Sequence, residues 1–136
     1  MKLKMLESNS NVYFQQTNNR SLGLRIARMT SLMPTNMVVI TYFNLASSHN
    51  LEFKNTFQVV LAYNSKTTYA ILIYDRLDSQ HATVGYSAPG CHWKLLSTPG
   101  MSSSMSSSSN TKDMGVHVHR LHSEDMKCSP YKGLLS

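Results

Sequence analysis

Charged residues are scarce in this sequence, and acidic residues are the scarcest. Charged side chains make up 15% of the 136 residues, below the quarter that is usual in globular domains, and 7 acidic residues stand against 13 basic ones. No two carboxylates form an obvious pair for general acid–base catalysis. The formal charge of +6 favours anionic partners. Because the basic residues are scattered and form no run of like charge, nucleic acid is not the expected partner.

Cysteines and signature motifs are also few. Cys91 and Cys128 are too few for a disulfide framework and have no CxxC spacing, so they could pair with each other, pair outside the chain or stay free. No apolar stretch is long enough to span a membrane. The first residues, MKLKMLESNSN, lack the apolar core of a secretory signal. Neither a phosphate-binding glycine loop nor a GxSxG elbow is present, so we expect no enzyme and no cofactor.

The most regular stretch is NTFQVVLAYNSKTTYAILIYD, residues 55–75. Two apolar runs flank a polar turn at residues 64–67, which predicts a β-hairpin. Phe57, Val59 and Leu61 share one face of the first strand, and Val60 and Ala62 lie on the other. Because both faces are apolar, the hairpin is predicted to be central in a sheet and covered on both sides.

A helix is predicted near residues 20–32. Leu22, Ile26 and Met29 recur at helical spacing, Asn18 or Asn19 is a suitable N-cap, and Pro34 stops the helix. The length allows one domain. We therefore expect an α+β fold, in which a β-dominated antiparallel sheet or sandwich packs against one N-terminal helix. The further expected strands are residues 11–17, 36–45, 81–87, 91–97 and 115–121.

The segment HVHRLH is the main candidate for metal chemistry. His117 and His119 point to the same face of a strand, and His122 and Cys128 could complete a zinc site of a metal-dependent enzyme. No partner stands at a ligand-like spacing, however. The preferred interpretation is that two strand positions carry imidazoles, with no metal bound.

The hairpin resembles the core of the extracellular NIDO domain, which is shared by nidogen, alpha-tectorin and related matrix and mucin-like proteins. The segments NVYFQQTNNRSLGLRI, NMVVITYFNL, ATVGYSAPG and SSSNTKDMGVHVHRL resemble further parts of that domain in the same order. The resemblance covers residues 11–125, with 1–10 expected to be a frayed N-terminus and 126–136 a tail. The family-motif residues are Asn55, Thr56, Phe57, Gln58, Tyr74 and Gly85.

Some positions depart from the family pattern. Tyr42 stands where the family usually has tryptophan, and His117 and His119 stand where aromatic or branched residues are usual. The connection between Asp75 and His81 is short and lacks a tryptophan-containing stretch that is common in relatives.

The resemblance implies a non-catalytic extracellular module that mediates cell–matrix adhesion through protein–protein contacts. Its partners would be extracellular matrix or cell-surface proteins, its location extracellular, and Asn19, in the sequon Asn19-Arg20-Ser21, a glycosylation site. Phe57 and Tyr74 are expected to pack, and Asn55 and Gln58 to satisfy backbone groups.

The serine-rich residues 99–110 are expected to form a flexible surface loop. The expected contact loops are residues 46–50 and 102–110. The alternative function is that of a basic intracellular protein that binds nucleic acid or another polyanion.

Overall fold

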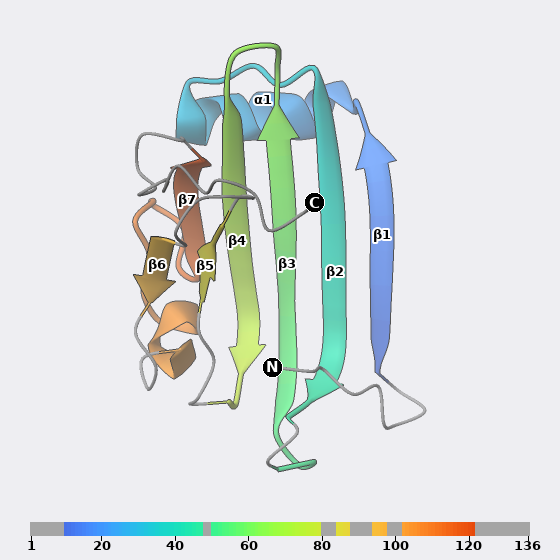
Figure 1. The fold of residues 1–136 in the computed structure, drawn as a ribbon, viewed down its shortest axis with the longest axis vertical. Coiled ribbons are helices and arrows are strands. Elements are labelled where there is room, and N and C mark those ends of the chain that lie inside the picture. Colours follow the sequence, from blue (N-terminus) through green and yellow to red (C-terminus); the bar gives the residue numbers. More distant parts are fainter. Residues whose placement is uncertain (1–9, 48–49, 80–83, 88–93, 98–101, 122–136) are drawn as a thin grey trace, which may run out of the picture.

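The fold is a five-stranded antiparallel sheet with one helix packed on it, which confirms the predicted fold class (Figure 1). The computed structural model describes residues 10–47, 50–79, 84–87, 94–97 and 102–121. In spatial order the strands are β1 (Asn11–Thr17), β2 (Asn36–Ala46), β3 (Lys54–Tyr63), β4 (Thr68–Leu77) and β7 (Val116–Leu121). A second, two-stranded sheet pairs β5 (Val84–Tyr86) with β6 (Lys94–Ser97).

The predicted hairpin, β3 and β4, lies at the centre of the sheet. Its turn occupies residues 64–67, where the Asn64 carboxamide oxygen accepts the N–H groups of Lys66 and Thr67. An asparagine side chain that binds backbone two and three residues on stabilises such a turn. In the resulting register Phe57 lies opposite Tyr74 and Val60 opposite Ile71.

The helix α1 (Arg20–Thr30) crosses one end of one sheet face, as Figure 1 shows. It begins because the Asn19 side chain accepts the N–H of Leu22, an N-cap bond of 3.0 Å. It ends because Ser31 adopts a left-handed conformation with φ of 60°. The helix is therefore two residues shorter than expected.

The core on the α1 side is formed by the strand positions that the alternation predicts to share a face. The buried residues are Ile26, Met37, Val60, Ala62 and Ile71. Removing each large member from water stabilises the fold by about 1.5–3 kcal/mol. This core ties α1 to β2, β3 and β4.

The opposite face has its own core over β3, β4 and β7. Leu72 and Tyr74 are buried there with Met105, which belongs to the 3₁₀ helix η1 (Ser102–Ser106). The expectation of a flexible surface loop over residues 99–110 was therefore wrong for residues 102–106, which form η1. The Met105 side chain packs against Leu72 and Tyr74.

A β-bulge marks the end of β2. Asn44 takes a left-handed φ of 52° between the paired residues Tyr42 and Leu45. Its N–H donates to the Thr56 hydroxyl, and its carbonyl accepts the Ser10 hydroxyl at 2.7 Å. Ser10 is thus buried although we expected it in a frayed N-terminus, whose other residues, 1–9, lie outside the described part.

Candidate functional site

The motif residues Asn55 and Gln58 have different partners. Buried Asn55 donates to the Leu45 carbonyl and accepts the N–H of Ser79, so it joins the ends of β2 and β4, as expected. Gln58 instead donates to the Thr41 hydroxyl at 2.8 Å, a bond between side chains of neighbouring strands. The expectation that Gln58 satisfies backbone groups was wrong, because Gln58 lies within β3 directly opposite the Thr41 hydroxyl.

An aromatic row crosses the sheet on the face opposite α1. Tyr42 stacks on Phe57 with ring centroids 4.6 Å apart, and Phe57 meets Tyr74 at 5.9 Å. Tyr74 in turn meets the edge of His117 at 5.9 Å. Burial raises the pKa of Tyr74 to about 12. Tyr42 therefore takes part in ring packing at one end of this row.

His117 is part of the core. Its Nε2 lies 2.9 Å from the Met105 carbonyl, which can only accept, so this nitrogen carries the proton and donates. His119 projects to the same face as His117. In the register of β4 and β7, His117 lies opposite Leu72 and His119 opposite Ala70. Among the residues that the structure describes, no group of three or more histidine, cysteine or acidic side chains could hold a metal ion. His122 and Cys128 lie outside the described residues.

Gly115 is a structural position that the sequence analysis missed. It has a φ of 72°, and a Cβ built on it would lie 2.5 Å from the Tyr74 carbonyl oxygen. Its own carbonyl accepts the N–H of Tyr74 at 2.8 Å. Only glycine meets both conditions without strain. A glycine directly before an alternating strand is the signal that could have indicated it.

The outer edge of β7 is closed by the segment that precedes it. The Asn110 side chain accepts the N–H of Val118 and donates to its carbonyl, both at 2.8 Å. The N–H of Val116 donates to the Asp113 carbonyl, and the Val116 carbonyl accepts the Ser109 hydroxyl at 2.6 Å. The outward backbone groups of both residues are therefore satisfied within the chain.

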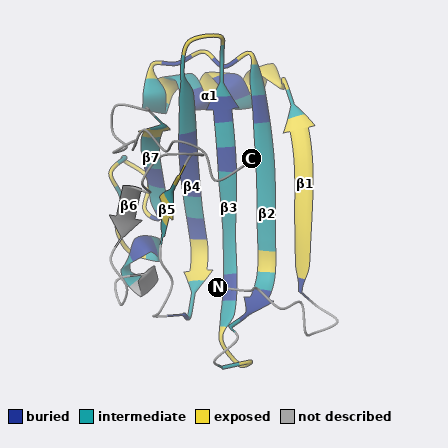
Figure 2. Ribbon diagram, viewed as in Figure 1, coloured by how far each residue is buried: buried dark blue, intermediate teal, exposed yellow. Residues whose placement is uncertain are grey.

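Within the described residues, the outer edge of β1 is open. Its seven residues, NVYFQQT, contain no charge and no proline, and they pair with β2 without a bulge. Val12, Tyr13 and Phe14 are 43%, 57% and 69% exposed. Figure 2 shows β1 exposed along almost its whole length, whereas every residue of β3 is intermediate or buried. Natural proteins protect edge strands with charges, proline or bulges, and β1 has none of these.

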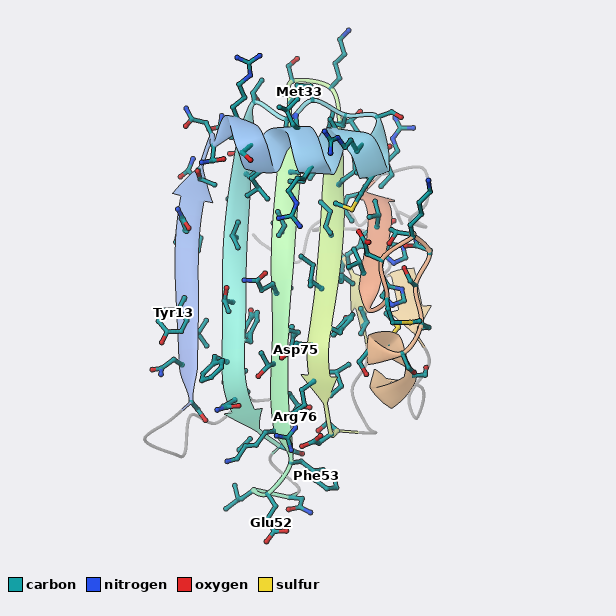
Figure 3. The ribbon with its side chains drawn as sticks, turned by 180° about the vertical axis from the view of Figure 1, so that it is seen from behind. Tyr13, Met33, Glu52, Phe53, Asp75 and Arg76 are labelled. Carbon is teal, nitrogen blue, oxygen red and sulfur yellow. The ribbon has the colours of Figure 1, made fainter. Side chains whose placement is uncertain are left out.

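A second exposed feature is the tip between β2 and β3. Leu51 and Phe53 are 49% and 37% exposed and flank Glu52. Asn50 shapes the turn by accepting the N–H of Glu52 on its side chain and that of Phe53 on its carbonyl. Figure 3 shows Glu52 and Phe53 at the end of the molecule far from α1.

The expected contact loops only partly match these features. In the loop 46–50 Ala46 is buried, Ser47 and Asn50 are half-buried, and residues 48–49 lie outside the described part. The neighbouring Leu51 is exposed. In the loop 102–110 the side chains of Met105 and Asn110 serve the fold.

The other predicted site residues are dispersed. Asn19 is exposed and caps α1, Gly85 is exposed in β5, and both are remote from the hairpin motif in sequence. Cys91 and Cys128 lie outside the described residues.

The fold and these contacts define a β-sheet module whose matched residues serve packing and strand pairing. The family profile described as the nidogen-like domain, NIDO, matches residues 4–123, which is most of the chain. The chain belongs to the nidogen-like domain family. No curated protein and no solved structure matches it.

Membership gives the class of function. The family consists of non-enzymatic modules of the extracellular matrix type, typically extracellular and with protein partners. Within the described residues, no helix has the length and apolar character needed to cross a bilayer.

Proposed function

We propose that the protein is a non-catalytic extracellular module that mediates cell–matrix adhesion through protein–protein contacts at the β2–β3 tip. The observation that carries the proposal is the pair of exposed apolar side chains, Leu51 and Phe53, held on a turn that Asn50 fixes. Apolar and aromatic side chains presented on a rigid scaffold are the usual anchors of protein contacts. The partners are matrix or cell-surface proteins, and the location is extracellular.

Hydrogen bonds join the described residues of the tip to the sheet. Ser47 donates its N–H to the Phe53 carbonyl, and Lys54 donates its N–H to Asp78 just after β4. Asp78 also forms an ion pair of 2.7 Å with Arg76. A contact loop fixed at both ends loses less conformational entropy on binding.

The test is solid-phase binding of the full chain to reconstituted basement-membrane matrix and to cultured cells. The variant L51S/F53S is expected to lose adhesion by about tenfold or more, because truncated anchors dominate interface energies. The matched control is Met114→Ser, which removes a 70% exposed apolar side chain from another turn. Adhesion unchanged in L51S/F53S, or equally reduced in the control, would refute the tip as the contact surface.

The second candidate, polyanion binding, is favoured by one observation. Arg20, Arg25 and Arg28 are all exposed on α1, and α1 contains no acidic residue. Single-stranded DNA and heparin are suitable probes. Binding through these arginines should fall steeply between roughly 50 and 200 mM salt and be lost in R20Q/R25Q/R28Q. Adhesion through the apolar tip should change little over that range.

A further inference from the structure

The open edge of β1 is self-complementary in its chemistry. It carries no charge, so a second identical strand placed beside it meets no like-charge repulsion. Its residues form an uninterrupted register with β2 from Asn11 to Thr17, which leaves a straight outer edge. No hydrogen bond from the described residues outside β2 satisfies the outward backbone groups of this strand.

Phe14 is both the midpoint of β1 and the most exposed of its apolar residues. An antiparallel pair of identical strands has a two-fold axis, and an axis at the midpoint places Phe14 opposite Phe14 of the second copy. Tyr13 then faces Gln15, Val12 faces Gln16, and Asn11 faces Thr17. Every pair is uncharged, and the central aromatic pair is of the kind that stabilises sheets.

The apolar surface beside Phe14 continues into the sheet. Phe14 lies opposite Ile40, Ile40 opposite Val59, and Val59 opposite Leu72, so these side chains form one row on the face opposite α1. Ile40 and Val59 are only half-buried. A second copy joined at Phe14 doubles this row into one continuous apolar strip.

We propose that β1 is a homotypic pairing edge, at which two copies of the chain join through antiparallel β1–β1 contacts centred on Phe14 into one continuous sheet. The contact uses a different part of the molecule from the β2–β3 tip, so it stands independently of the adhesive function. In this contact, backbone hydrogen bonds supply the affinity and the Phe14–Phe14 pair sets the register.

The test is sedimentation velocity of the full chain, with a reducing agent present, at protein concentrations between roughly 1 and 300 µM. Small interfaces dissociate in this range. The native chain is expected to form a dimer as concentration rises. Phe14→Lys and Phe14→Glu should each raise the dissociation constant by about tenfold or more, because each puts like charges directly opposite. A mixture of F14K and F14E should recover the dimer, as a one-to-one heterodimer by native mass spectrometry.

Leu24→Lys is the matched control, since it puts the same charge at a 45% exposed apolar position on α1. It should leave the dimer unchanged. Should F14K lose cooperative urea unfolding, Phe14→Ser replaces it, and the same weakening is expected. A native chain that stays monomeric to the highest concentration would overturn the proposal. A dimer that persists in F14K and F14S would also overturn it, as would a mixture of F14K and F14E that stays monomeric.

Discussion

The two edges of the sheet, β7 and β1, differ in whether other described residues hydrogen-bond their outward backbone groups. At β7, the preceding segment folds back so that Asn110, Ser109 and Asp113 satisfy the outward groups of Val116 and Val118. At β1, seven uncharged residues present their outer edge with Phe14 at its midpoint. An edge that is costly to leave unpaired is closed in one case and left available in the other.

The difference separates residues that stabilise the fold from residues that are available for association. Two of the residues that close β7, Ser109 and Asn110, lie in the segment whose composition predicts a flexible loop. That segment also supplies Met105 to the core beneath it. The closed edge is thus part of the folding unit, whereas substitutions on β1 should alter association far more than stability.

The largest effect is expected at Gly115, where the closing segment meets β7. Gly115→Ala forces a side chain into a left-handed conformation and against the Tyr74 carbonyl, and it weakens the bond from Tyr74 N–H. The loss should be about 3 kcal/mol of unfolding free energy. Urea unfolding measures it. Gln16→Ala on β1 should change stability by less than about 0.5 kcal/mol, and an equal loss there would break the comparison.

The second effect concerns Asn110. Asn110→Ala removes both side-chain bonds to Val118 and should cost about 1–3 kcal/mol. It also opens the β7 edge, so it should promote association beyond the dimer. Light scattering and urea unfolding check the two parts. Ser108→Ala, which alters an exposed side chain of the same segment, is the control. Stability unchanged in Asn110→Ala would contradict the closing role.

The third effect is a pH dependence from Tyr74. Its pKa is raised from 10.0 to about 12 by burial, so the unfolded chain ionises first. The contribution of the neutral Tyr74 hydroxyl to the free energy of unfolding is complete below pH 10. It is lost as the pH rises towards 12, by up to about 1.4 kcal/mol per pH unit. Tyr74→Phe should flatten this alkaline loss. Tyr13→Phe, at the open edge, leaves Tyr74 in place and should retain it.

The smallest effect is expected on α1, which belongs to neither edge. A Cβ at Gly23 would lie in ordinary contact, 3.6 Å from the Pro34 ring. Gly23→Ala should therefore stabilise the protein by about 0.5–1 kcal/mol through helix propensity. A destabilised variant in thermal unfolding would show that α1 lies closer to Pro34 than this spacing allows.

The strands, the central hairpin and the helix cap were predictable because each depends on local alternation or on one capping side chain. Residues 64–67 and Asn19 illustrate this. The edge position of β1 was not predictable, since Val12, Tyr13 and Phe14 have the composition of a buried strand. Its exposure follows from pairing partners distant in sequence.

The roles of Met105 and Asn110 were hidden for a related reason. Repeated serine and methionine have no period that separates buried from exposed positions. The bonds of Asn110 reach back to the outer edge of β7, which the sequence pattern does not indicate. Gln58 was assigned to the wrong partner because the facing residue, Thr41, is known only from the register.

The most direct measurement is amide hydrogen exchange, residue by residue, at low and high protein concentration. At low concentration the Val118 amide should be protected by Asn110, while alternate amides of β1, those that point outward, should exchange rapidly. The β1 amides should become protected as concentration rises, and they should stay unprotected in F14K. Outward β1 amides that exchange as slowly as Val118 at the lowest concentration would contradict the difference between the two edges.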